Sequence, residues 1–293
     1  MCSLTAGERW ESLAPFSDGA RQEHGAAAIG QKIYIISGFK LGGNTSDTAY
    51  TTETIQIYDI DTNTWSGAAP MPVPMNHPNV AATSGKIYVL SGLRGESNNS
   101  LNGSSIVSVY GDEIILAGGV QKIEYKVNGA EETVNIVSAF NIRTHEWRSY
   151  PQLPEGREHA GGAIMSDKFY VVGGRYLSPL NVRGTVYVLS LKSLQWDELA
   201  PMPTPRGGIS VAAVGERIYT FGGEGNPDPN AGDVFNQTEV YDVQANCWQQ
   251  LKPMDIPRHG TAAVAVGGII YTPGGGAKDG ITSCPAKALK QAY

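Results

Sequence analysis

Six segments of the chain share one pattern of hydrophobic and polar positions. Each has two runs of β-branched, small and aromatic residues, separated by a short polar turn such as "GQK", "SDK" or "GER". Strand-forming residues on both sides of turn-forming residues predict a β-hairpin. Each segment closes on a glycine, in most copies the second of a pair, and these closing glycines are Gly38, Gly92, Gly119, Gly174, Gly223 and Gly275.

The spacing of these hairpins predicts the architecture. Successive closing glycines are 54, 27, 55, 49 and 52 residues apart. A second hairpin follows in four copies, where a large residue precedes a tryptophan by seven positions: Tyr58 and Trp65, Phe140 and Trp147, Leu189 and Trp196, Tyr241 and Trp248. A period of about 50 residues, with four strands and no helical pattern, is typical of a propeller blade.

The glycine pairs, the spacing to tryptophan and an arginine at the start of several copies together resemble the kelch-repeat family and the related galactose-oxidase-like propellers. The resemblance runs from about Trp10 to about Gly276. It implies an all-β, kelch-type β-propeller on a six-bladed plan. We expect one propeller domain over residues 1–276. We expect an irregular C-terminal tail over 277–293, because the tail lacks the signature of a third strand.

Two features depart from a simple repeat. Trp10 has no hairpin before it and lies one period before Trp65, so we expect the N-terminal strand to close the ring as the outer strand of the last blade. The 27-residue interval between Gly92 and Gly119 predicts a second blade that lacks about half its strands. Either the gene product is shortened, or the blade is open by design and exposes a sheet edge.

Composition narrows the functional classes. The formal net charge is -6 and no run of lysine or arginine occurs, which argues against a general nucleic-acid-binding or membrane-surface protein. No apolar run approaches the length of a membrane span, and the first residues lack the pattern of a signal peptide. We therefore expect a cytoplasmic protein, and a monomer.

One position in the repeat carries arginine more often than any other residue. It lies seventeen residues before each closing glycine, and we name it the ring position; its occupants are Arg21, Met75, Asn102, Arg157, Arg206 and Arg258. The first strand of each propeller blade lines the central channel, so this position recurs around one mouth of the channel. Guanidinium groups gathered there would bind carboxylates or phosphates.

The resemblance implies the same role, because kelch domains that recruit acidic peptide segments use arginines from the start of this strand. The alternative is structural, with each arginine bracing its blade. Under that alternative Glu23 and Glu158, close in sequence to Arg21 and Arg157, would neutralise them.

Four histidines lie within three residues of the ring position: His24, His77, His159 and His259. Because a shift of one residue turns a strand side chain to the opposite face, these four cannot all share one site. His77 and His159 have the same phase and form the one credible pair. The copper site that galactose oxidase implies requires a cysteine near the mouth, and neither Cys2, Cys247 nor Cys284 is suitably placed. We therefore predict no metal and no cofactor.

The sequence thus predicts a protein-interaction module. Its binding residues would be Arg21, Arg157, Arg206 and Arg258 with His77 and His159, and its partner an acidic protein segment or an anionic small molecule. The alternative is a non-oxidase enzyme that binds an anionic or carbonyl substrate at the same mouth, with His77 or His159 as general base. A third possibility is an inactive product of a shortened gene. The sequence assigns no catalytic residue and identifies no partner.

Overall fold

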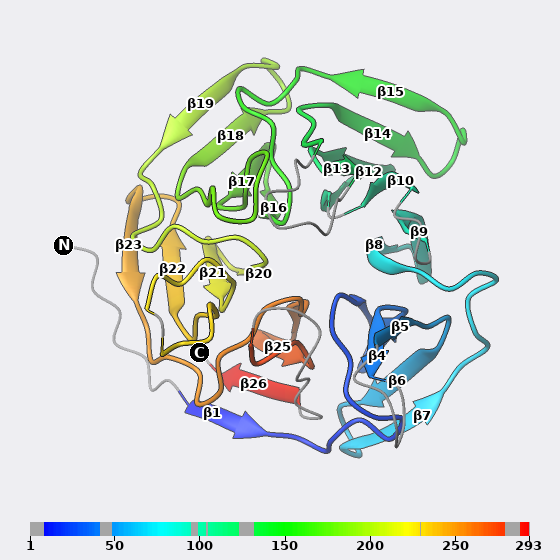
Figure 1. The fold of residues 1–293 in the computed structure, drawn as a ribbon. Coiled ribbons are helices and arrows are strands. Elements are labelled where there is room, and N and C mark those ends of the chain that lie inside the picture. The colour runs from blue at the N-terminus through cyan, green and yellow to red at the C-terminus, as the bar shows by residue number, and fades with distance from the viewer. Residues whose placement is uncertain are drawn as a thin grey trace.

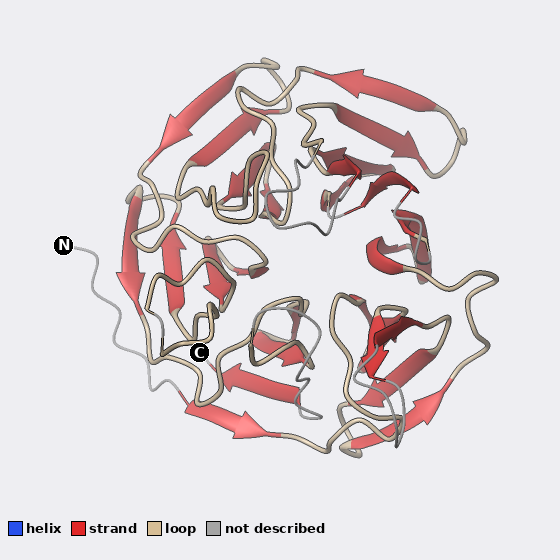
Figure 2. Cartoon of the chain, in the orientation of Figure 1, coloured by secondary structure: helices blue, strands red, loops and turns tan. Residues whose placement is uncertain are grey.

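The computed structural model describes residues 9–41, 49–94, 99–103, 105–122, 132–228, 230–278 and 288–292. Every regular element within these residues is a β-strand, drawn in red in Figure 2. Six four-stranded antiparallel sheets stand as blades around a central axis (Figure 1). The predicted all-β propeller is therefore confirmed. In the described part of the chain, no helix is long and apolar enough to cross a membrane.

The blades are numbered by the order of their innermost strands, and their strands are given from the channel outward. Blade 1 contains β2 (Gly25–Ile29), β3 (Lys32–Ile36), β6 (Ile55–Asp59) and β7 (Thr64–Gly67). Blade 2 contains β8 (Asn76–Thr83), β9 (Lys86–Leu93), β10 (Asn99–Gly103) and β13 (Val120–Lys122). Blade 3 contains β11 (Ile106–Tyr110), β12 (Glu113–Ala117), β14 (Val137–Asn141) and β15 (Trp147–Tyr150).

Blade 4 contains β16 (Gly161–Met165), β17 (Lys168–Val172), β18 (Val186–Ser190) and β19 (Trp196–Leu199). Blade 5 contains β20 (Ser210–Val214), β21 (Arg217–Phe221), β22 (Thr238–Asp242) and β23 (Cys247–Gln250). Blade 6 contains β24 (Val264–Val266), β25 (Ile269–Pro273), β26 (Ala288–Ala292) and β1 (Arg9–Ser12). A small hairpin of β4 (Phe39–Leu41) and β5 (Ala49–Thr51) extends from blade 1.

The innermost strands contact one another around the whole ring, from β2 through β8, β11, β16, β20 and β24 back to β2. The apolar core lies between neighbouring blades. Phe169 of blade 4 packs in one cluster with Ile115 of blade 3, and Tyr241 of blade 5 packs in another with Val188 of blade 4. Burial of large side chains between sheets is what holds the blades side by side.

The hairpins that end in tryptophan form the outer half of blades 1, 3, 4 and 5, as predicted. In each, the large residue lies directly opposite the tryptophan across the strand pair. Three indole N–H groups also donate to a backbone carbonyl of the segment that leaves the preceding blade: Trp65 to Ala14, Trp196 to Pro151 and Trp248 to Ala200. Each of these tryptophans therefore joins its blade to a neighbour.

The N-terminal strand closes the ring, also as predicted. Strand β1 pairs with β26 as the outermost strand of blade 6. Trp10 repeats the contact of the other tryptophans, since its indole N–H donates to the carbonyl of Lys252 beyond blade 5 at 3.1 Å. Its ring packs edge-on against Phe221 with 5.8 Å between centroids.

The expectation of an irregular tail over 277–293 is wrong for Ala288–Ala292. This segment forms β26, the third strand of blade 6, between β25 and β1. It contains no aromatic or β-branched residue, so its own sequence gives no strand signal. Its place is set by its backbone pairing with β25, the preceding strand, and with β1 from the other end of the chain.

The predicted loss of about half the strands in blade 2 is also corrected. The blade has four strands, because β10 follows β9 and β13 returns from beyond the second strand of blade 3 to take the outermost position. The hairpin that ends in tryptophan is absent there, as expected. Strand β13 has only three residues, and its register with β10 shifts. Blade 2 therefore covers its neighbour poorly, and Trp147 of blade 3 is 53% exposed.

The two tryptophans give a test of ring closure. We expect Trp10→Ala to lower the free energy of unfolding by about 3–5 kcal/mol, because it removes a 9%-exposed ring from the joint between blades 5 and 6. The matched variant Trp147→Ala, on the poorly covered blade 3, should cost less than about 1 kcal/mol. Chemical denaturation monitored by circular dichroism measures both. Equal losses in the two variants would contradict closure through Trp10.

Candidate functional site

The four arginines of the ring position are buried. Arg21, Arg157, Arg206 and Arg258 are each 0% exposed. The prediction that they present accessible cations at the channel mouth is therefore wrong. Their side chains point into the blades. The residues that follow them in the chain line the mouth.

Each arginine braces its own blade. Arg157 donates to the carbonyl oxygen of Gly173 at 3.1 Å, Arg206 donates to that of Gly222 at 2.6 Å, and Arg258 donates to that of Gly274. In these three blades the acceptor is the first glycine of the closing pair, sixteen residues later, whereas Arg21 donates to the carbonyl oxygen of Thr54 at 3.0 Å. This contact explains the fixed spacing between arginine and glycine in the sequence.

Carboxylates and hydroxyls complete the bracing. Arg206 forms a fully buried ion pair with Glu239 at 2.5 Å and donates to the hydroxyl of Thr220 at 3.0 Å. Arg157 donates to Glu155 at 2.9 Å, and Arg21 lies 3.5 Å from Asp18. Glu23 and Glu158, which the sequence offered as neutralising partners of Arg21 and Arg157, have other contacts.

The backbone at the ring position joins neighbouring blades. The carbonyl oxygen of Arg157 accepts the N–H of Gly119 at 2.7 Å, and that of Arg206 accepts the N–H of Gly174 at 2.9 Å. The same bond joins Gly38 to Met75, Gly223 to Arg258, and Gly275 to Arg21. A Cβ atom at Gly118 or Gly222 would collide with the arginine carbonyl of the next blade. The paired glycines therefore permit a close contact between blades.

Two residues beyond the ring position, the backbone is left-handed in five blades. The residues are Glu23, His77, His159, Gly208 and Gly260, with φ between 48° and 60°. Glycine adopts this conformation at no steric cost, whereas other residues are strained by about 1–3 kcal/mol. Blades 5 and 6 have the relaxed residue, while blades 1, 2 and 4 retain a side chain in spite of the strain.

The three strained side chains meet at the mouth of the channel. One ligand atom of each, from Glu23, His77 and His159, lies within 4.8 Å of the others. Nε2 of His77 is 3.0 Å from a carboxylate oxygen of Glu23, and the two imidazole rings meet edge to face with 4.9 Å between centroids. His77 and His159, which the sequence pairs by their shared phase, are thus in contact although they belong to blades 2 and 4, and their role in binding stays a prediction.

A second group of charges surrounds these three residues. Arg175 donates to Glu158 at 2.7 Å and also to Glu224, and so joins blades 4 and 5. The imidazole Nδ1 of His259, on blade 6, lies 3.3 Å from Glu224 and 3.6 Å from Glu23. We name the full set, comprising Glu23, His77, Glu158, His159, Arg175, Glu224 and His259, the mouth cluster.

The mouth cluster holds its carboxylates ionised. Burial raises the pKa of Glu23, but the facing His77, His259 and His159 outweigh burial and bring the pKa below its ordinary value. The same balance, with Arg175 and His159 as the opposing charges, lowers the pKa of Glu158. Burial lowers the pKa of His259, and Glu224 and Glu23 reverse this and raise it to about 9. The cluster is therefore a set of buried, mutually compensating charges.

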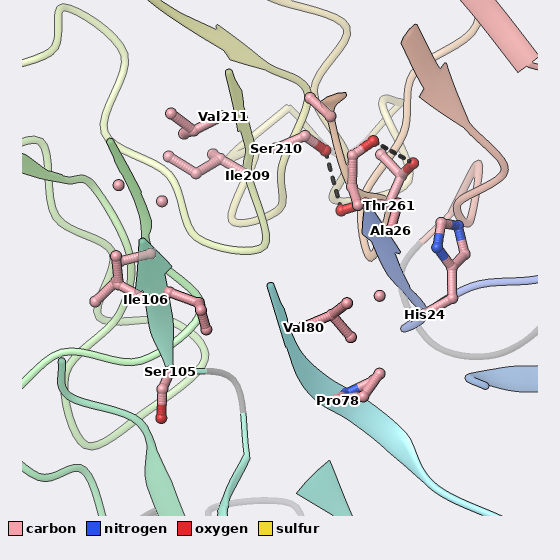
Figure 3. A pocket seen from close by; sticks show the side chains of 17 residues that line it. His24, Ala26, Pro78, Val80, Ser105, Ile106, Ile209, Ser210, Val211 and Thr261 are labelled. Carbon is pink, nitrogen blue, oxygen red and sulfur yellow. Dashed lines mark hydrogen bonds between the residues drawn. The ribbon is translucent and has the colours of Figure 1, made fainter. Parts of the chain in front are cut away.

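The cluster stands over a cavity that continues into the channel. A space of about 120 Å³ is lined by Glu23, His77 and His159 together with Gly208 and Gly260. Deeper inside, a cavity of about 180 Å³ is bounded by the innermost strands. Figure 3 shows Val80, Ile106 and Val211 on its walls. The charged groups are thus concentrated at the mouth, whereas the deeper cavity is lined by His24, by the hydroxyls of Ser210 and Thr261, and by apolar side chains.

Sequence reasoning found part of this site. It identified His77 and His159, and it named Glu23, Glu158 and His259 without giving them their roles. It missed Arg175 and Glu224, although each follows directly after a closing glycine pair. Cys247 does not supply the cysteine of a copper site, because it begins the outermost strand of blade 5 and is disulfide-bonded. Cys2 and Cys284 lie outside the described residues.

Comparison with known proteins identifies two matching domain families. A model described as KLHDC2/KLHL20/DRC7 Kelch-repeats domain matches residues 103–284, and a Kelch motif matches residues 20–72. Similar proteins include Kelch-like protein terF of Aspergillus terreus, 38% identical over 296 residues that cover 90% of this chain and 63% of that protein. Kelch-like protein 23 of Homo sapiens is 22% identical over 271 residues, covering 91% of this chain and 39% of that protein.

Beta-scruin of Limulus polyphemus is 30% identical over 160 residues, which cover 51% of this chain and 17% of that protein. The chain therefore spans less than two thirds of the length of each of these three relatives. What they share with it is the repeat domain.

The buried ion pair tests the bracing role. We expect Arg206→Met to lower the free energy of unfolding by about 3–5 kcal/mol, because it leaves Glu239 buried without its cation. The double variant Arg206→Met, Glu239→Met should recover part of this loss. Arg143→Met, which removes an exposed pair with Asp112, is the control and should cost less than about 1 kcal/mol. An Arg206→Met protein as stable as the wild type would refute the brace.

Proposed function

The chain belongs to the kelch-repeat family, and on that premise we propose that it is a protein-interaction module that binds a partner's peptide segment over the channel mouth. Kelch-repeat proteins generally act as protein-interaction modules. The propeller supplies a rigid frame, and the loops at the mouth supply the variable contacts. The partner itself is not specified by this proposal.

The observation that carries the proposal is two exposed leucines in the loop that begins at the mouth cluster. Leu180, in the loop between β17 and β18, is 83% exposed, and Leu177 in the same loop is 44% exposed. The loop starts at Arg175 of the mouth cluster, and the leucines follow that residue by two and five positions along the chain. Large apolar side chains exposed to solvent, in a loop that begins at a polar site, are suited to anchor a partner segment.

The loop is also held in a defined shape. Leu177 has a left-handed backbone with φ of 61°, and its N–H donates to the hydroxyl of Thr133 from blade 3 at 2.9 Å. The amide of Asn181 donates to the carbonyl of Tyr176, and Arg183 forms an ion pair with Glu155. A preorganised loop loses less conformational entropy when it binds.

The guanidinium groups of the ring-position arginines are buried in the blades, so they do not bind the partner segment. The proposal therefore does not require an acidic segment. The polar groups that a segment would meet are those of the mouth cluster, in which carboxylates, imidazoles and one guanidinium alternate. Such a surface favours a segment with hydrogen-bonding groups of both kinds, flanked by apolar residues that contact Leu177 and Leu180.

A peptide library displayed on phage tests this function directly. We expect the folded propeller to enrich peptides with a common sequence, and Leu177→Asp with Leu180→Asp to weaken the selected peptide about tenfold or more. Leu194→Asp is the matched control, because Leu194 is 42% exposed and left-handed like Leu177 but lies in the β18–β19 turn, at the opposite end of the strands. Isothermal titration calorimetry measures the affinities. No enrichment on a folded protein, or equal loss in the control, would refute the proposal.

A further inference from the structure

The geometry points to a binding site for a divalent transition metal, formed by Glu23, His77 and His159 at the channel mouth. This inference is independent of the proposed partner binding. Two imidazoles and one carboxylate are a donor set that suits zinc and ferrous iron, and imidazole disfavours calcium and magnesium. Glu23, His77 and His159 come from blades 1, 2 and 4, respectively, so a bound ion would join three separate blades.

The donor atoms are almost close enough for a shared ion. Around a tetrahedral zinc ion, ligand atoms about 2.0–2.1 Å from the metal lie about 3.3 Å from one another. Nε2 of His77 is already 3.0 Å from the carboxylate of Glu23, and all three ligand atoms fall within 4.8 Å. Changes of side-chain torsion, without movement of the blades, would bring the third ligand to the metal.

The outer contacts of the histidines are those of metal ligands. Nδ1 of His77 lies 2.6 Å from the side-chain oxygen of Asn76, and Nδ1 of His159 contacts the carboxylate of Glu158. An acceptor at Nδ1 orients the ring and makes Nε2 the ligand atom, as in the carboxylate–histidine–zinc arrangement. The ring of His77 is thus oriented by Asn76, and that of His159 by Glu158 together with the guanidinium of Arg175, which lies 2.8 Å from the same Nδ1.

Charge and burial also favour a cation. The side chains of His77, Glu23 and His159 are only 6%, 12% and 7% exposed. The three carboxylates of the mouth cluster, Glu23, Glu158 and Glu224, outnumber by one the two cations that pair with them, the guanidinium of Arg175 and the imidazolium of His259. Buried carboxylates in excess of neighbouring cations are stabilised by a metal ion that replaces the missing charge.

The strained backbone is the second independent sign of a site. Glycine occupies the equivalent position in blades 5 and 6, so the fold accepts glycine there and would be relieved by it. In blades 1, 2 and 4, the chain instead has a metal-ligating side chain at this same position, two residues beyond the ring position. Gly260 also leaves room for the carboxylate of Glu23, because a Cβ atom on that glycine would collide with it.

Three protein ligands leave a coordination position open. The 120 Å³ cavity is lined by the same three residues, so a water molecule or a small ligand can reach the metal from this side. A closed, four-ligand structural site would have no such space. The open position distinguishes this site from a purely structural metal.

Metal titration of the tag-free, chelator-stripped protein tests the inference. We expect one Co²⁺ per chain with visible d–d absorption that Zn²⁺ abolishes, and a rise in melting temperature on adding Zn²⁺. The variant His77→Gly, His159→Gly should bind at least about 100-fold more weakly. Glycine is chosen because it relieves the left-handed backbone and so offsets part of the stability lost with the two imidazoles; circular dichroism checks that the variant is folded.

His145→Gly is the matched control. His145 is also left-handed, with φ of 60°, but it is exposed in the outer turn of blade 3. It should bind metal as the wild type does. If the double variant does not fold, His77→Gly alone and Glu23→Gln provide the same comparison. A folded wild type without stoichiometric Co²⁺ binding, or a double variant with unchanged affinity, would overturn the inference.

Discussion

The propeller depends on the close contact between a ring-position carbonyl and the closing glycine of the preceding blade. Five such N–H to carbonyl bonds, between 2.7 and 2.9 Å, join neighbouring blades at the mouth. At four of these joints the residue that supplies the carbonyl is an arginine whose guanidinium is buried in its own blade. The backbone of that residue holds two blades together, while its side chain fixes the end of one. This dual role explains why the same residue recurs at a fixed distance from the glycines.

That constraint also places the functional residues. Because the ring-position side chain turns into the blade, the next two residues direct theirs towards the channel mouth. The left-handed turn at Glu23, His77 and His159 is part of the joint, since the N–H of His77 donates to the carbonyl of Glu23 and the N–H of Glu23 donates to that of Gly260. The residues that join the blades and the residues that form the mouth cluster are therefore consecutive in the chain.

The sequence predicts the features that repeat and fails where a feature occurs once. The closing glycines and the tryptophan pairs predict the blades, and Trp10 predicts closure, because each is a local pattern seen several times. Strands β13 and β26 have no such pattern, since distant partners hold them in place. The arginines show another limit: their spacing reveals a common role, but only the packing shows that the guanidinium turns into the blade. Arg175 and Glu224 were missed because each acts through a partner from another blade.

Blade 2 links these observations. Its outer strands are short, and the only buried apolar cluster confined to it in the described residues consists of Leu93 and Val120. It therefore contributes less apolar burial to the ring than its neighbours do, and its inner strand needs other contacts. His77 supplies them, through its backbone bond to Glu23 and through side-chain contacts with Glu23 and His159. The polar cluster is consequently placed where the apolar core is weakest. An ion held by these three residues would fix blade 2 to blades 1 and 4, so metal binding and closure of the ring would be coupled through His77.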